Sequence, residues 1–345
     1  MTPVMKRLFF VLLIAGILPV TWGRATASAQ TSGARTTAHE LLGRTPFAFS
    51  QSGTRIHLYS PEIKEAVKIF VIADTHLYLS DEREDPYRDY SKRMAAAYNG
   101  TRHFQTGEPT GPEEAFRATL ALAKEQGADA IALLGDIVSY PSEAGVELAV
   151  KLLDETGIPW FYTTGNHDWH YEGMEGTEIE LREKWTQERL APLYKGHDHL
   201  IYSVEVKGVK LIFLDNGVYE ILPEQLAAFK REAKGKQPKL LFSHIPFYAP
   251  GFGVSYGCGN PDWNEAHDHG FRAERRPKWP AAGHTATTYA MWKAVGKACR
   301  QHRVLASFAG HIHRLSSSVV DGWPQFVTPA NAEGGYYEVT LEPMP

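Results

Sequence analysis

An almost continuous apolar run ends in two polar side chains in the segment Val67-Lys68-Ile69-Phe70-Val71-Ile72-Ala73-Asp74-Thr75-His76. A run of this kind is typical of a strand that is buried on both faces, as in a parallel sheet covered by helices. The polar residues that follow it would then lie at the carboxyl end of the strand, where open α/β sheets bind their ligands.

Strand and helix patterns alternate along the rest of the chain, so we expect an α/β protein. Predicted helices cover residues 112–126, 142–155, 177–190, 223–233 and 285–301. Predicted strands cover residues 67–73, 130–134, 160–163, 200–206, 209–214, 239–243, 304–308, 316–320, 325–328 and 336–341. Two long stretches, 77–111 and 247–283, show no regular pattern and are predicted to be loops, and loops of such length usually serve a function.

The N-terminus has the pattern of a secretory signal peptide, which we assign to residues 1–29. Lys6-Arg7 precedes an apolar run at 8–20, and Ala27-Ser28-Ala29 matches a cleavage signal of small residues. An uncleaved anchor is the alternative. Residues 30–45 are predicted to be a flexible lead-in, and residues 46–345 a single domain. Export would place the protein in a periplasm or outside the cell.

Composition narrows the classes of protein to consider. The chain has 345 residues, 43% hydrophobic and 22% charged, which excludes collagen-like, coiled-coil and wholly disordered proteins. Removal of the predicted signal, with its three basic residues, changes the formal charge from −4 to −7. An acidic chain disfavours duplex nucleic acid as a partner, and no second apolar stretch indicates a membrane span. Cys258 and Cys299 could form a disulfide or remain two buried thiols.

Five predicted strands end in residues that can bind metals or move protons. The strand ends are Asp74-Thr75-His76, Gly135-Asp136, Gly165-Asn166-His167-Asp168, Ser243-His244 and Gly310-His311-Ile312-His313. We expect them to meet at one edge of the sheet. Their carboxylate, amide and imidazole groups are the donors that divalent transition metals prefer.

This set of donors is larger than one metal ion needs. The carboxylate of Asp136 can bridge two ions roughly 3.5–4 Å apart, as in two-metal phosphatases. Such ions lower the pKa of bound water and attract phosphate, so a hydroxide that bridges the metals would be the nucleophile. We therefore expect a dinuclear phosphoesterase with Mn, Zn or Fe.

The ordered blocks D-x-H, G-D, G-N-H-D, H and G-H-x-H resemble the calcineurin-like metallophosphoesterase superfamily. The resemblance implies two mixed sheets packed face to face with helices outside, an αββα sandwich. It implies one metal bound by Asp74, His76, Asp136 and His313, and a second bound by Asp136, Asn166, His244 and His311. His167 matches the family's general acid or transition-state stabiliser, and Asp168 would orient its imidazole.

Each of these residues also has an ordinary structural explanation. Asp74 and Asp136 could cap helices, Asn166 could form a turn, and His244 could be a core histidine. Trp169 and His170 directly follow the catalytic block and are candidates for substrate contact. The motif Gly196-His197-Asp198-His199 imitates a metal-binding block, but no buried strand precedes it, so we interpret it as an exposed turn. His267-Asp268-His269 could line the substrate entrance or be a solvated loop.

Purple acid phosphatases are similar but carry D-x-G first and a tyrosine in G-D-x-x-Y. Here Asp74-Thr75-His76 comes first, and Tyr140 lies one position too late, so an iron–tyrosine centre is not expected. The expected substrate is a small phosphate mono- or diester such as a nucleotide, a sugar phosphate or a lipid head group. The rival hypothesis is a secreted binding protein on the same fold that has lost catalysis.

Overall fold

A computed structural model describes residues 46–254, 257–264, 266–267 and 283–344. The predicted signal peptide and lead-in lie outside the described residues, as do Asp268 and His269 of the candidate entrance motif. No helix among the described residues is long and apolar enough to cross a membrane.

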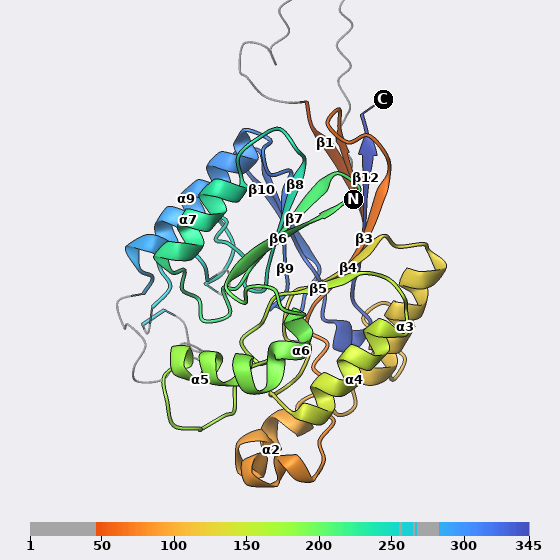
Figure 1. Ribbon diagram of the computed structural model, residues 1–345, viewed down its shortest axis with the longest axis vertical. Helices are drawn as coiled ribbons and strands as arrows, with labels where there is room; N and C mark the ends of the chain where they lie inside the picture. The colour runs from red at the N-terminus through yellow and green to blue at the C-terminus, as the bar shows by residue number, and fades with distance from the viewer. Residues whose placement is uncertain (1–45, 255–256, 265, 268–282, 345) are drawn as a thin grey trace, which may run out of the picture.

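The core consists of two mixed six-stranded sheets that pack face to face, as the resemblance implied (Figure 1). In the first, the strand order is β1 (Ala48–Ser52), β2 (Arg55–Ser60), β12 (Tyr337–Pro343), β3 (Val67–Ile72), β4 (Ala130–Leu133) and β5 (Trp160–Tyr162). In the second, the order is β10 (Ser316–Val320), β11 (Trp323–Val327), β9 (Ala306–Ala309), β8 (Lys239–Ser243), β7 (Val209–Leu214) and β6 (Ile201–Val206).

Helices cover the outer faces of both sheets. Figure 1 shows α3 (Pro112–Glu125) and α4 (Glu143–Asp154) beside the first sheet, and α7 (Pro223–Glu232) and α9 (Ala286–Arg300) beside the second. Alternate residues of β3 enter different cores: Ile69 and Val71 pack between the sheets, whereas Phe70 and Ile72 pack toward the helices. Burial on both faces explains why β3 is apolar almost throughout.

The remaining helices lie near the carboxyl ends of the strands. They are η1 (Glu82–Tyr87), α2 (Arg88–Ala96), α5 (Glu178–Trp185), the π-helical turn η2 (Thr186–Leu190), α6 (Ala191–Tyr194) and the short η3 (Asn331–Glu333). The predicted helix at 177–190 therefore continues through a π-helical turn into α6. Its start is fixed by a capping box between Thr177 and Glu180.

The prediction of a structureless loop at 77–111 was wrong for η1 and α2. Their signal is weak because only Ser91 and Met94 of α2 are buried, so its sequence lacks a clear apolar stripe. The Asp81 carboxylate accepts a hydrogen bond from the Arg83 backbone N–H and begins η1. The β1–β2 hairpin was not predicted. Cys258 and Cys299 are both buried and form no disulfide.

Candidate metal centre and substrate pocket

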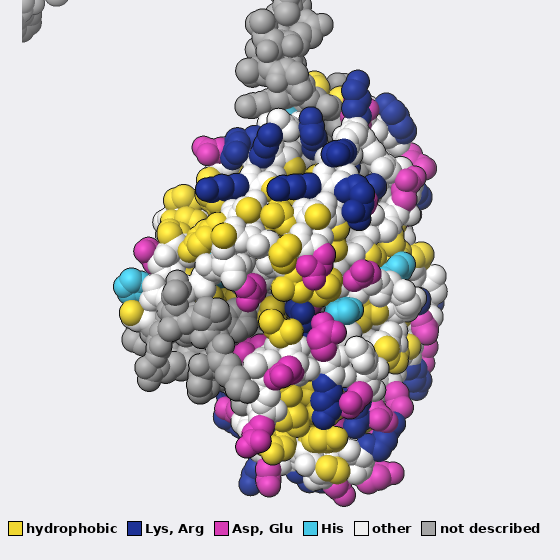
Figure 2. Space-filling view, turned by 60° about the vertical axis from the view of Figure 1, so that its left-hand side comes forward, with side chains coloured by type: hydrophobic (Ala, Val, Ile, Leu, Met, Phe, Trp, Pro, Cys, Tyr) yellow, Lys and Arg dark blue, Asp and Glu magenta, His cyan; other side chains and the backbone are white. Residues whose placement is uncertain are grey.

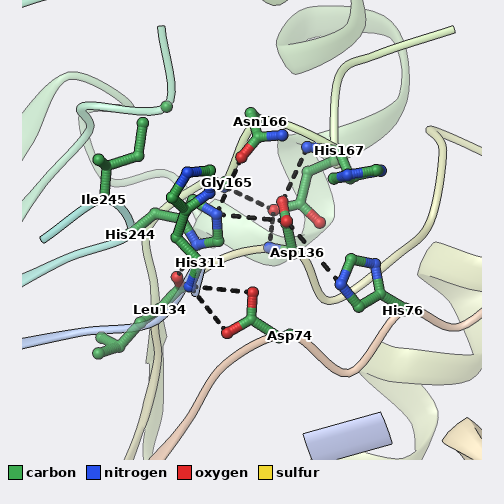
Figure 3. Close-up of polar contacts among 12 residues, drawn as sticks. Asp74, His76, Leu134, Asp136, Gly165, Asn166, His167, His244, Ile245 and His311 are labelled. Atoms are coloured by element: carbon green, nitrogen blue, oxygen red, sulfur yellow. Dashed lines mark hydrogen bonds and ion pairs between the residues drawn. The ribbon is translucent and has the colours of Figure 1, made fainter. Parts of the chain in front are cut away.

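The polar strand ends meet at one edge of the two sheets. β3, β4 and β5 are parallel in one sheet, and β7, β8 and β9 are parallel in the other, so their carboxyl ends share an edge. In Figure 3, Asp74, His76, Asp136, Asn166 and His244 point toward one another from four different segments. The structure thus brings together side chains up to 239 positions apart in the chain, His313 included.

The first group of donor atoms comprises Asp74, His76 and His313. Nε2 of His313 lies 3.3 Å from Oδ1 of Asp74 and 3.2 Å from Nε2 of His76. The Asp74 and His76 side chains are fully buried. Two imidazole nitrogens that face each other at this distance beside a carboxylate form a set that suits a divalent cation.

The second group is centred on Asp136. Nε2 of His244 lies 3.2 Å from Oδ2 of Asp136 and 3.1 Å from Oδ1 of Asn166. The same Asp136 oxygen is 3.9 Å from Nε2 of His76, so Asp136 lies between the two groups. Nδ1 of His244 lies 2.7 Å from the Leu134 carbonyl. When Nδ1 donates its hydrogen there, Nε2 presents a lone pair to a cation, the usual second-shell arrangement of a metal-binding histidine.

The ligand atoms that lie within 4.8 Å of one another form two three-residue groups, one of Asp74, His76 and His313 and one of Asp74, Asp136 and His244, and His311 belongs to neither. Its Nε2 is paired with the Tyr219 hydroxyl. Its backbone N–H donates to both Asp74 oxygens, at 3.0 and 2.9 Å. His311 therefore adjoins the centre and helps to position Asp74, while Tyr219, which sequence reasoning missed, holds its ring.

The electrostatics of the centre favour positive charge between the carboxylates. Burial acts to raise the pKa of Asp136, but the neighbouring imidazoles, His244 first, bring it well below its ordinary value. Burial acts to lower the pKa of His244, but Asp136 raises it to about 9. Burial brings the pKa of His76 well below its usual value, so this ring stays neutral, as a metal ligand must.

The backbone at the centre is held in uncommon conformations. The left-handed region contains ten non-glycine residues in the described part of the chain, and five of them are at the centre: Asp74, His76, Asp136, His311 and His313, with φ between 52° and 74°. Such conformations persist only where the surroundings impose them, and they cluster at functional sites. Gly165 allows a close approach, because a Cβ atom there would overlap Oδ1 of Asp136.

The expectation that Asp168 orients His167 was wrong. Its carboxylate instead accepts hydrogen bonds from the backbone N–H groups of Asp136, Val138 and Gly165, at 2.8 to 3.0 Å, and from the Tyr162 hydroxyl. Sequence adjacency suggested a catalytic pair, but His167 is not among the hydrogen-bond partners of the Asp168 carboxylate in the described part of the chain. Asp168 is a structural residue that fixes the loops carrying Asp136 and Asn166.

His167 lies at the wall of a pocket of about 320 Å³ beside the donor groups. Its backbone N–H donates to Oδ1 of Asp136 at 2.8 Å, and its Nδ1 is buried without a hydrogen-bond partner among the described residues. Trp169 and His170, the two candidates for substrate contact, also line this pocket.

Another wall of the pocket comes from the segment 77–111, for which the sequence pattern predicted no regular structure. It consists of Arg93, Met94, Ala97 and Tyr98. The Tyr98 ring stacks on His76 with the ring centroids 4.0 Å apart. Burial and the nearby carboxylates raise the pKa of Tyr98, so its hydroxyl keeps its proton as a donor. The high aromatic content of 77–111 was the one signal that could have found it.

The motif at 196–199 is not part of the centre. His197 stacks on Tyr202 at 4.4 Å between ring centroids, and Nε2 of His199 lies 3.2 Å from a Glu183 carboxylate oxygen. Tyr140 also points elsewhere, since its hydroxyl donates to the Tyr78 carbonyl.

A sequence model of the calcineurin-like phosphoesterases matches residues 67–315. No curated protein matches the chain. Among solved structures, a dimetal phosphatase from Danio rerio is 12% identical with a TM-score of 0.48, over 78% of this chain and 89% of that one. A purple acid phosphatase from yellow lupin is 11% identical with a TM-score of 0.46, over 82% of this chain and 48% of that one. A putative 5′-nucleotidase from Staphylococcus aureus is 13% identical with a TM-score of 0.42, over 78% and 49%.

Proposed function

Because the chain belongs to the calcineurin-like phosphoesterase family and is therefore a metal-dependent hydrolase of phosphoric esters, we propose that it cleaves a small phosphate ester at a two-cation centre. The observation that supports this most strongly is the position of Asp136. One of its carboxylate oxygens lies between the His244 and His76 imidazoles, which belong to different donor groups. A carboxylate in that position is suited to bridge two ions.

The family resemblance implies how the donors would divide between two ions. Asp74, His76, Asp136 and His313 would hold one ion, and Asp136, Asn166, His244 and His311 would hold the other. When bound, such ions supply an activated water as nucleophile and neutralise phosphate charge. The nitrogen and oxygen donors suit Mn, Zn or Fe, and no sulfur ligand is among them.

His167 would act as the general acid. Its ring lines the pocket, and because Nδ1 is the buried nitrogen, we assign the proton given to the leaving oxygen to Nε2. The backbone hydrogen bond from His167 to Asp136 fixes the distance between this acid and the cation site. A positioned general acid contributes roughly 10²- to 10⁴-fold in rate.

The pocket beside His167 would hold the leaving group of a small ester. Met94, Tyr98 and Trp169 give it apolar and aromatic walls, and Arg93 and Glu172 add opposite charges at an accessible position. Its volume is at the lower end of the range for small-molecule sites. A nucleotide, a sugar phosphate or a lipid head group is therefore a better candidate than a polymer.

A paired assay tests this proposal. Chelated protein reloaded with Mn, Zn or Fe(II) is given p-nitrophenyl phosphate and bis-p-nitrophenyl phosphate in parallel. We expect turnover that depends on the added cation, with the monoester preferred. Turnover that survives chelation, or binding of phosphate analogues without turnover under any of the three cations, would contradict the proposal.

We further propose that the protein is exported to a periplasm or to the outside of the cell. The support is the basic and apolar pattern at residues 6–20 and the small residues at 27–29. Cell fractionation followed by N-terminal sequencing tests it. A mature chain that begins near Gln30 is expected, and full-length protein in the cytoplasm would contradict it.

A further inference from the structure

The end of the molecule opposite the metal centre carries a concentration of basic side chains. Figure 2 shows Lys and Arg gathered at the upper end, where the parallel strands begin. We call this surface the basic face and define it by eight residues that are exposed, or half-buried in the case of Arg300: Lys207, Lys230, Arg231, Lys234, Lys236, Lys297, Arg300 and Arg303.

Hydrogen bonds join the segments of the basic face into one surface. The Lys210 backbone N–H donates to the Pro238 carbonyl at 2.9 Å, which ties the β6–β7 turn to the loop after α7. The Leu305 N–H donates to the Lys239 carbonyl at 2.8 Å, which ties that loop to the segment after α9. The backbone segments that carry the basic side chains therefore keep fixed relative positions.

The acidic residues at this end neutralise only part of the charge. Asp129 pairs with Lys207, and Asp321 lies 4.0 Å from Arg300. Glu232 pairs with Arg231 and also with Lys210. The remaining basic side chains make no ion pair with another described residue, namely Lys230, Lys234, Lys236, Lys297 and Arg303. This surplus of positive charge is local, because the chain as a whole has a formal net charge of −4.

Stabilisation of helix ends explains the positions of only four of the eight basic residues. Lys230, Arg231, Lys297 and Arg300 lie in or near the last turns of α7 and α9, where cations stabilise the helix dipole. The other four residues of the basic face lie outside both helices. Positive charge also acts on Lys239, which is buried beneath the basic face. Burial is the main cause that lowers the pKa of Lys239 to about 8, and the charges of Lys210 and Arg303 add to it.

The chain enters the domain beside the basic face. β1 is antiparallel to β2, β2 is parallel to β12, and β12 is antiparallel to β3, so β1 begins at the same end as β3. The Phe47 ring lies 5.5 Å from the ring of His302, next to Arg303. The sequence that would remain ahead of the domain after the proposed signal cleavage, residues 30–45, therefore joins it at this end.

We propose that the basic face lies against an anionic phospholipid bilayer. Charge complementarity supports this partner. The proposal also rests on the proposed export, because an exported domain meets the lipid surface of the cell envelope rather than nucleic acid. Strands of five to six residues at roughly 3.3 Å per residue separate the basic face from the centre by about 17–20 Å. The metal centre would then face the aqueous phase, open to small esters.

Vesicle co-sedimentation of the mature chain, which begins at Gln30 by the proposed cleavage, tests this inference. The probes are vesicles of phosphatidylcholine alone and vesicles with three parts in ten of phosphatidylglycerol. The test variant is Lys230→Gln/Lys234→Gln/Lys236→Gln, and the control is Lys92→Gln/Lys124→Gln/Lys184→Gln, which removes the same charge outside the basic face. Every arm uses the chain from Gln30 onward, so the apolar run at 8–20 contributes to none of them.

We expect the wild type and the control to prefer the anionic vesicles, and the test variant to lose about tenfold or more of that preference. Salt should weaken binding of the wild type. Unchanged p-nitrophenyl phosphate turnover in the test variant would show that it is folded. Equal binding to both vesicle types, or equal loss in test and control variants, would overturn the proposal. Binding of a DNA duplex through the same three lysines, without binding to vesicles, would also overturn it.

Discussion

Asp136 follows β4 and Asp168 follows β5, and both are buried, with 1% and 0% of their surface exposed. The Asp168 carboxylate accepts three backbone N–H groups and a phenol. The Asp136 carboxylate accepts one backbone N–H, and its other oxygen faces imidazoles. A carboxylate whose lone pairs are used by backbone donors has none left for a cation. The same residue type therefore positions loops at Asp168 and offers a metal site at Asp136.

Substitution of Asp136, the carboxylate that faces the metal site, should have the largest effect on turnover. Asp136→Asn keeps the shape but removes the charge between the two donor groups, so we expect turnover of p-nitrophenyl phosphate to fall by about 10⁴-fold. The unfolding free energy of the metal-free protein should also fall, because the variant removes the carboxylate that pairs with the buried His244 imidazole. Steady-state kinetics and urea unfolding check both expectations. Near wild-type turnover would remove Asp136 from the centre.

His167→Ala separates proton transfer from cation binding. We expect a loss of about 10³-fold in turnover, within the range for a general acid, while the cation content stays that of the wild type. Elemental analysis of the same samples used for kinetics makes the comparison. Loss of cations equal to that in Asp136→Asn would show that His167 holds the centre together rather than acting in the reaction.

Asp168→Ala tests, through protein stability, whether the Asp168 carboxylate positions the loops around it. It leaves the backbone N–H groups of Asp136, Val138 and Gly165 without their acceptor, so the unfolding free energy should fall by about 3 kcal/mol. Tyr162→Phe removes a single donor from the same carboxylate and should cost about 1 kcal/mol. Urea unfolding measures both. If Asp168→Ala lost turnover with unchanged stability, the catalytic role first predicted for Asp168 would be restored.

The pH dependence of stability gives the smallest effect. Burial and the charge of Asp136 raise the pKa of Asp168 from 3.8 to about 6. The folded metal-free protein then binds a proton more readily than the unfolded chain, so this residue stabilises the fold as the pH falls through 6. From pH 7 to pH 5, the stability difference between wild type and Asp168→Ala should grow by about 1 kcal/mol. A difference that shrinks over this range would mean that the pKa is not raised.

The sequence patterns predicted an α/β protein and the convergence of the strand ends, because both follow from local periodicity. The two sheets packed face to face were implied by the family resemblance. The apolar run before Asp74 indicated a doubly buried strand, and the parallel order required the polar ends to meet. The role of each residue at the edge where the strand ends meet was harder to predict. Spacing places Asp168 next to His167 but does not show which backbone N–H groups face its carboxylate, since those come from the loop after β4.

The wall of the substrate pocket escaped prediction for a different reason. α2 buries little of its surface, and Tyr98 reaches the centre only through tertiary packing against His76. Neither the periodicity nor the composition of residues 77–111 encodes that contact. Tyr219 likewise follows β7 in sequence but meets His311 through the arrangement of the second sheet.

The most direct test of the two-cation centre is the metal content of purified, chelated and reloaded protein. Equilibrium dialysis against Mn or Zn followed by elemental analysis should give two ions per wild-type chain, and Asp136→Asn should lose both. A wild-type chain that binds one ion or none, or an Asp136→Asn chain that keeps two, would contradict the account.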